Sequence, residues 1–254
     1  MQQTNTPKST PQQESVKIPA EEEEEAQKLD KKALTGDILY GAVKSIGGTI
    51  LKFTNNLTIE GQDNIPMFGK AILVTISKNV LLDMLIISQL SGRKVHFMVN
   101  PKLMKTPVVG PVLKTLGMFR STLNKEDQEP IEKVFDILNN KGNLVAMTPE
   151  ARLSDEVQLK SVAAIIKFAV AADAPIIPLA IFSETKTLLN VIPITRLKVR
   201  IGKPISMDKK LNRDKFRPER YKTAEEIIRI IYKLQVDEKE PPSALAIISN
   251  LEKK

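Results

Sequence analysis

The chain has 254 residues, enough for one large α/β domain or two small ones. It contains no cysteine and one histidine, His96, which excludes disulfides, thiol nucleophiles and cysteine-ligated zinc. We therefore expect no metal site. The formal net charge of +8 indicates an anionic partner, whereas 4% aromatic residues and no tryptophan argue against nucleic acid held by base stacking.

Residues 1–32 are rich in Gln, Thr, Ser and Pro and include five consecutive glutamates. Such a segment cannot bury enough apolar surface to fold, so we expect a disordered acidic tail rather than a signal peptide. Its net charge of −2 leaves about +10 on residues 33–254. No uninterrupted apolar run approaches the ~18 residues of a spanning helix. The absence of cysteine fits a reducing cytosol, so we expect a cytoplasmic protein.

Residues 33–56 predict an amphipathic N-terminal helix, weakened by Gly47 and Gly48. Its apolar residues recur at three- to five-residue steps: Leu34, Ile38, Val43, Ile46, Ile50 and Phe53. Two interpretations are open. The helix packs on the core, or it lies on an anionic membrane surface, as basic amphipathic segments do.

Residues 57–254 alternate short apolar runs with amphipathic segments of ten to fifteen residues. We expect strands at 57–61, 71–76, 94–99, 143–148, 175–182 and 197–205, and helices at 79–90, 129–142, 161–174 and 220–236. Residues 101–117 read as a Pro/Gly-punctuated loop followed by a short helix. This alternation predicts a single α/β domain with a mostly parallel central sheet flanked by helices.

Ligands bind at the carboxyl ends of the strands in such sheets, and several polar residues follow predicted strands. Ser77, Lys78 and Asn79 follow one strand, with Asp83 one helical turn further on. The sequence PEARLS at 149–154 follows another. An arginine there suits a phosphate because its planar fork donates two hydrogen bonds, although a plain surface ion pair with Glu150 is equally consistent with the sequence.

Six segments in order resemble the phospholipid/glycerol acyltransferase family, which includes the 1-acylglycerol-3-phosphate acyltransferases. They are LTIEGQDNIP, AILVTISKNVLLD, GPVLKTLGMF, LVAMTPEARLS, PIIPLAI and VRIGKPI, between residues 57 and 205. The resemblance implies a glycerolphosphate acyltransferase-like fold. It also implies transfer of an acyl group from acyl-CoA or acyl carrier protein to a lysophospholipid such as 1-acylglycerol-3-phosphate, in phospholipid biosynthesis. The acyl donor would be a co-substrate, and no bound cofactor is expected.

The resemblance also implies residue roles. In an H-x-x-x-x-D motif, histidine removes the proton of the acceptor hydroxyl; here Asp83 matches the aspartate and Lys78 stands at the histidine position. The remaining matches would bind substrate: Gly117 and the nearby Arg120 in a second block, Glu150 and Arg152 in a P-E-G-R-like third, and Pro178 in a fourth beside the acyl pocket.

Lys78 fits the proton-transfer role poorly. Lowering a lysine pKa from about 10.4 to neutrality takes roughly 4.6 kcal/mol, and an ionised Asp83 nearby opposes that shift. We therefore expect a Lys78–Asp83 ion pair, or a Lys78 that binds an anion. Two functions remain open: an acyltransferase with a divergent catalytic pair, or an inactive pseudoenzyme that binds lipid or acyl chains. Both would sit at the periphery of an anionic phospholipid membrane, attracted by the basic residues concentrated after Thr195.

Overall fold

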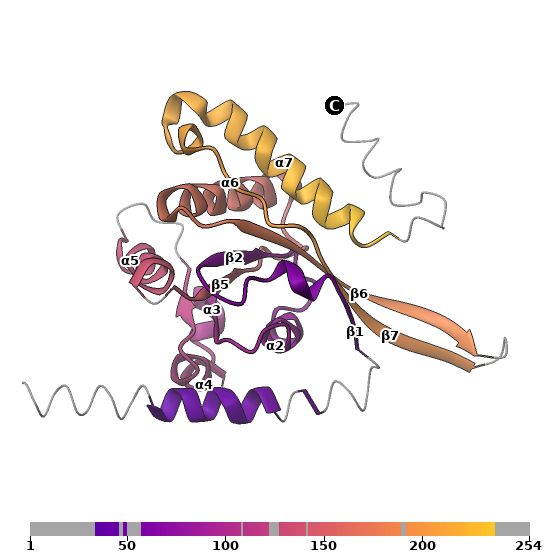
Figure 1. Ribbon diagram of the computed structural model, residues 1–254. Helices are drawn as coiled ribbons and strands as arrows, with labels where there is room; N and C mark the ends of the chain where they lie inside the picture. Colours follow the sequence, from indigo (N-terminus) through magenta and orange to yellow (C-terminus); the bar gives the residue numbers. More distant parts are fainter. Residues whose placement is uncertain are drawn as a thin grey trace, which may run out of the picture.

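The computed structural model describes residues 34–45, 48–49, 57–107, 109–121, 127–140, 142–188 and 192–236. The predicted tail at 1–32, part of the predicted N-terminal helix and the end of the chain after Val236 lie outside these residues. The described part contains a seven-stranded sheet in the order β1-β7-β6-β2-β5-β3-β4 (Figure 1). Its strands are β1 (Thr58–Glu60), β2 (Ala71–Val74), β3 (Val95–Val99), β4 (Phe119–Arg120), β5 (Leu144–Met147), β6 (Ile176–Leu188) and β7 (Ile192–Ile201).

All pairings in the sheet are parallel except that between β6 and β7. These two strands pair from Leu179–Ile201 out to Leu188–Ile192 and extend beyond the body as a two-stranded arm (Figure 1). The predicted single α/β domain with a mostly parallel sheet is thus confirmed. The strands predicted at 175–182 and 197–205 exist, but β6 runs further and β7 begins earlier, so that they form a hairpin.

Helices cover both faces of the sheet. They are α2 (Val80–Gln89), α3 (Pro101–Met104), α4 (Val109–Thr115), α5 (Glu129–Phe135), α6 (Asp155–Ala172) and α7 (Arg217–Lys233), and a π-helical turn at Asp136–Asn140 continues α5. Figure 1 shows α6 and α7 on one face and α2 with the N-terminal helix on the other. Alternation along β2 explains the two cores: Ile72 and Val74 pack towards α6, whereas Ala71 and Leu73 pack towards α2.

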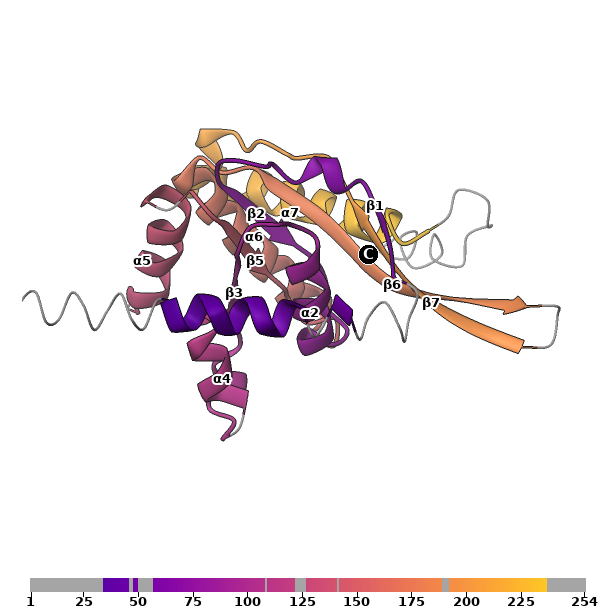
Figure 2. The ribbon, with the colours of Figure 1, turned by 60° about the horizontal axis from the view of Figure 1, so that its bottom comes forward.

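The N-terminal helix, described over 34–45, lies on the face of the sheet that also carries α2 and α4 (Figure 2). It packs inward through buried Tyr40, whose hydroxyl accepts a hydrogen bond of 3.1 Å from the backbone N–H of Val95. Leu34 and Ile38 point outward and are 62% and 66% exposed. Over residues 34–45 the helix therefore does pack on the domain, but through the face that carries Tyr40, and Leu34 and Ile38 remain at the surface. The predicted apolar positions Ile46, Ile50 and Phe53 lie outside the described residues.

Candidate functional site

The ends of β2 and β5 are joined by backbone hydrogen bonds. The N–H of Ser77 donates to Pro149 O at 2.8 Å, and the N–H of Ala151 donates to Ser77 O at 2.7 Å. Ser77 and Glu150 thus form a parallel bridge beyond the two strands. The fold brings the segment carrying Lys78 and Asp83 beside the segment carrying Glu150 and Arg152, as expected for neighbouring carboxyl ends of parallel strands.

Asp83 is held in the first turn of α2. The Asn79 side chain caps this helix by accepting from the N–H of Leu82 at 3.3 Å, and the Asp83 N–H donates to Asn79 O at 2.9 Å. The Asp83 residue is only 5% exposed, and the Ser77 hydroxyl donates to its Oδ2 at 2.5 Å. Burial raises the pKa of Asp83, while the hydrogen bonds from Ser77 and from the backbone at Asn79 and the charge of Lys78 lower it and offset part of that rise.

Lys78 is exposed, and no ion pair within 4.0 Å joins it to Asp83 or to any other residue that the structure describes. The predicted Lys78–Asp83 ion pair is therefore absent, because the carboxylate lies inward where the Ser77 hydroxyl satisfies it. No pattern in the sequence pointed to Ser77 as the partner of Asp83. An exposed lysine also lacks the burial that proton acceptance by this side chain would require.

Glu150 and Arg152 form an ion pair, as the sequence allowed. The Glu150 side chain is 15% exposed, and its Oε1 accepts a hydrogen bond of 3.3 Å from the amide of Asn100 at the end of β3. The Arg152 side chain is 83% exposed. The carboxylate thus ties the ends of β5 and β3 together, while the guanidinium extends into solvent.

Arg120 ends β4 and is bound by two carboxylates. Its guanidinium donates to both oxygens of Asp127, at 2.9 Å for Oδ1, and to Glu129 Oε2 at 2.7 Å. Hydrogen bonding to Asp127, then to Glu129, raises the pKa of Arg120. This arginine is available to an added phosphate only in competition with two carboxylates of its own chain.

Gly117 and Pro178 have structural roles in the described residues. Gly117 ends α4 with a left-handed φ of 76°, its N–H donates to Lys114 O at 3.0 Å, and its carbonyl lies 3.4 Å from Nδ1 of the buried His96. Pro178 lies within β6 opposite Val74, and its carbonyl accepts from the N–H of Gly202 at 2.9 Å. Neither residue lines the groove described next.

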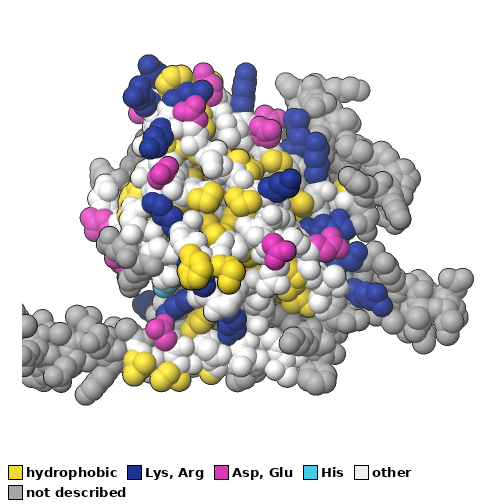
Figure 3. All heavy atoms as spheres, viewed as in Figure 1, with side chains coloured by type: hydrophobic (Ala, Val, Ile, Leu, Met, Phe, Trp, Pro, Cys, Tyr) yellow, Lys and Arg dark blue, Asp and Glu magenta, His cyan; other side chains and the backbone are white. Residues whose placement is uncertain are grey.

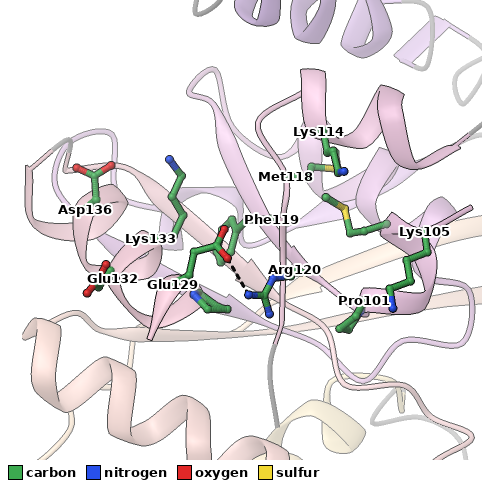
Figure 4. A pocket seen from close by; sticks show the side chains of 12 residues that line it. Pro101, Lys105, Lys114, Met118, Phe119, Arg120, Glu129, Glu132, Lys133 and Asp136 are labelled. Atoms are coloured by element: carbon green, nitrogen blue, oxygen red, sulfur yellow. Dashed lines mark hydrogen bonds and ion pairs between the residues drawn. The ribbon is translucent and has the colours of Figure 1, made fainter. Parts of the chain in front are cut away.

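A groove of about 750 Å³ opens at the carboxyl ends of β3 and β4, between α3, α4 and α5 (Figure 4). Of the predicted site residues, it contains Arg120. The residues that line it are Pro101, Met104, Lys105, Lys114, Met118, Phe119, Arg120, Glu129, Pro130, Glu132, Lys133 and Asp136. With adjacent strands spaced by ~4.8 Å, the end of β4 lies roughly 14 Å along the sheet edge from the end of β2.

Patterns along the sequence do not predict this groove, because its walls come from three separate segments. One signal was present: residues 94–121 contain no aspartate or glutamate, whereas residues 127–140 contain four of them and one lysine. Within the described ranges, no group of three or more His, Cys, Asp or Glu residues is arranged to hold a metal ion. None of the helices in those ranges combines the length and apolar character needed to cross a membrane.

Comparison with known proteins places these observations in a family. A search of curated proteins gives no match. Among solved structures, the crystal structure of the 1-acyl-sn-glycerophosphate acyltransferase PlsC from Thermotoga maritima is similar at 20% sequence identity and a TM-score of 0.49, over 88% of this chain and 86% of that one. The model of the family described as Acyltransferase matches residues 56–182, half of the chain and all of the predicted site residues. The chain therefore belongs to the acyltransferase family.

Proposed function

We propose that this protein transfers an acyl group from a thioester, carried by coenzyme A or acyl carrier protein, to the hydroxyl of a lysophospholipid. The observation that carries the proposal is the gathering of Asp83 and Glu150 at one sheet edge that also holds the groove. Family membership supports acyl transfer as the reaction class.

The reaction requires one proton to move. The acceptor hydroxyl oxygen attacks the thioester carbonyl and loses its proton, the C–S bond breaks, and the leaving thiolate takes up a proton. In our proposal the buried Asp83 carboxylate receives the hydroxyl proton through Ser77, whose hydroxyl already donates to it at 2.5 Å. The exposed ammonium of Lys78 stabilises the negative charge of the oxyanion or of a substrate phosphate.

A second candidate is a non-enzymatic lipid- or acyl-binding protein. One observation favours it: Ser77 is 2% exposed and Asp83 5% exposed, and neither of them lines the groove. A carboxylate that is buried and already hydrogen-bonded serves equally well to hold the start of α2 against the end of β2.

Peripheral attachment to a membrane is part of the proposal. Leu34 and Ile38 lie one turn apart on the outer side of the N-terminal helix, and Figure 3 shows apolar side chains along the rim where this helix lies. A basic body would add attraction to anionic lipids of about 1 kcal/mol per basic residue near the surface.

Thioester cleavage with lysophospholipid acceptors tests the proposal. Wild type, Lys78→Ala, Lys78→His and Asp83→Asn would be compared with acyl-CoA and with acyl carrier protein as donors. Acyl transfer by the wild type that falls ~10²–10⁴-fold in Asp83→Asn supports the enzyme. A silent wild type with activity gained in Lys78→His supports the binding protein, because the fold is then competent for the reaction and the natural chain lacks only a proton acceptor at residue 78.

A further inference from the structure

Arg120 is held in the groove by two carboxylates of its own chain. Its guanidinium makes a bidentate contact with Asp127, in which Nη2 lies 2.9 Å from Oδ1, and Nη2 also lies 2.7 Å from Oε2 of Glu129. One guanidinium against two carboxylates leaves this cluster with a formal charge of −1. As it stands the cluster is a poor site for a phosphate, although arginine is the residue type best suited to bind one.

The carboxylates around Arg120 are open to competition. The side chains of Arg120, Asp127 and Glu129 are 38%, 21% and 78% exposed. Ion pairs with this exposure are weak, because water and salt screen them. A phosphate monoester carries nearly two negative charges and three acceptor oxygens, so it can compete with these carboxylates for the guanidinium.

The wall formed by α3 and α4 offers positive charge to such a phosphate. Figure 4 shows Glu129 on one side of Arg120 and Lys105 on the other. In the part of the chain that the structure describes, no carboxylate lies within 4.0 Å of the ammonium group of Lys105, which is exposed. A phosphate that displaced the carboxylates from Arg120 would therefore also approach a cation without a partner of its own.

Apolar side chains surround this point of the groove. They are Pro101, Met104, Met118, Phe119 and Pro130. Methionine adapts to flexible hydrocarbon, and the volume of about 750 Å³ falls within the range of small-molecule sites, about 300–1,000 Å³. An alkyl chain attached to the phosphate suits such a surface, so the competing phosphate is expected on a lipid.

We propose that Asp127 and Glu129 are specificity-determining residues, which compete with a substrate phosphate for Arg120 and so hold down the affinity of the groove for that phosphate. Removal of both carboxylate charges changes the cluster from −1 to +1 and frees the guanidinium for the phosphate. The affinity for a lipid without a phosphate stays the same, because such a lipid gains nothing from a free guanidinium. The inference rests on the proposed function, since it assumes that a substrate with a phosphate enters the groove.

Calorimetric titration of the full chain at constant salt tests this competition independently of acyl transfer. The lipids are lysophosphatidate and monoacylglycerol of one chain length, both as monomers, which differ by the phosphate alone. Glycerol 3-phosphate and coenzyme A are the phosphates without a lipid chain. Comparison of lysophosphatidate with coenzyme A distinguishes the phosphate of the acceptor from those of the donor.

The variants isolate the contact with Arg120. Asp127→Asn/Glu129→Gln removes both charges and nearly keeps the shapes of the side chains. Glu129→Gln and Glu132→Gln form a matched pair, because both glutamates lie in the first turn of α5 and line the groove, and of the two Glu129 is the one paired with Arg120. Arg120→Gln/Asp127→Asn/Glu129→Gln removes the whole cluster.

We expect Asp127→Asn/Glu129→Gln to bind lysophosphatidate about fivefold more tightly than the wild type does, and to bind monoacylglycerol equally tightly. Glu129→Gln should give part of this gain, and Glu132→Gln should give less than Glu129→Gln. The triple variant should lose the gain. Glycerol 3-phosphate should follow lysophosphatidate with weaker binding throughout. A gain for coenzyme A and not for lysophosphatidate supports the competition and assigns it to the phosphates of the donor.

Equal gains in Glu129→Gln and Glu132→Gln would reveal a general effect of charge in the groove and overturn the inference. A gain that persists in the triple variant, an equal gain for monoacylglycerol, or no binding of any phosphate by Asp127→Asn/Glu129→Gln overturns it too. The proposed function fails separately. A gain in phosphate binding without acyl transfer in the thioester assay keeps the competition and removes the enzyme, whereas acyl transfer to lysophosphatidate with the same KM in wild type and Asp127→Asn/Glu129→Gln does the reverse.

Discussion

The hydroxyl of Ser77 donates a hydrogen bond of 2.5 Å to Oδ2 of Asp83, linking the residue beyond β2 to the first turn of α2. Both residues are buried, at 2% and 5% exposure. The aspartate that the sequence paired with Lys78 therefore has a neutral partner inside the domain. The Ser77–Asp83 hydrogen bond can serve proton transfer in the enzyme or simply hold α2 against β2 in a binding protein. The next two predictions test the energy of this contact.

Asp83→Asn should change how stability depends on pH. Burial raises the pKa of Asp83 above its usual 3.8, so the folded protein holds this proton more tightly than the unfolded chain does. The resulting stabilisation is present below the unfolded value and is lost as pH rises through the folded value. The free energy of unfolding of the wild type, minus that of Asp83→Asn, should thus decrease as the pH rises from the unfolded value of 3.8 through the higher folded value. Urea denaturation measures it, and a constant or increasing difference would contradict the burial argument.

Ser77→Ala should destabilise the protein by about 1–3 kcal/mol near neutral pH, because a buried carboxylate loses its hydroxyl donor. The loss should shrink at acid pH, where Asp83 is protonated. It should also shrink in an Asp83→Asn background, where no buried charge remains. A double-mutant cycle by chemical denaturation gives the coupling directly. Additive effects of the two substitutions would show that the hydrogen bond contributes nothing specific.

Gly110→Ala should disturb the packing of α4 against α3. A Cβ added at Gly110 would lie 2.1 Å from the carbonyl oxygen of Met104, so the two helices would have to separate. We expect the free energy of unfolding to fall by about 1–3 kcal/mol, as it does at other overpacked sites. Gly92→Ala is the matched control, because no heavy atom lies within 4 Å of its added Cβ. A thermal melt of Gly110→Ala that coincides with that of Gly92→Ala would show that the contact is tolerated.

Leu34→Gln/Ile38→Gln should weaken binding to vesicles that contain anionic phospholipid. Full burial of a leucine or isoleucine side chain contributes about 1.5–3 kcal/mol, so partial insertion of both predicts a loss of at least about tenfold. Co-sedimentation measures this loss, and binding by the wild type should also weaken with added salt. Met67→Gln/Phe68→Gln removes two exposed apolar side chains elsewhere and is the control. Equal losses in both variants would argue against a specific role for the N-terminal helix.

Local patterns in the sequence predicted several elements because those patterns report burial and capping directly. The apolar run 71–76 is β2 and its extension, and Asn79, a residue type favoured at helix N-termini, caps α2. Gly142, the last residue of the helix predicted at 129–142, has a positive φ, as glycines after helices often do. The two-residue β4 was missed, because so short a strand has no periodicity and exists only through its pairing with β3.

The sequence by itself determined the α/β class, the acyltransferase resemblance and the placement of polar residues after parallel strands, since these depend on periodicity, residue type and chain order. Tertiary structure alone decided which charges meet. In the folded chain Asp83 accepts a hydrogen bond from Ser77 and forms no ion pair with Lys78. Arg120 forms ion pairs with two carboxylates, and Leu34 and Ile38 lie exposed at the surface. The physical reason is that the partner of a charged or apolar side chain depends on distance and burial in the folded chain. Spacing along the sequence specifies neither of them.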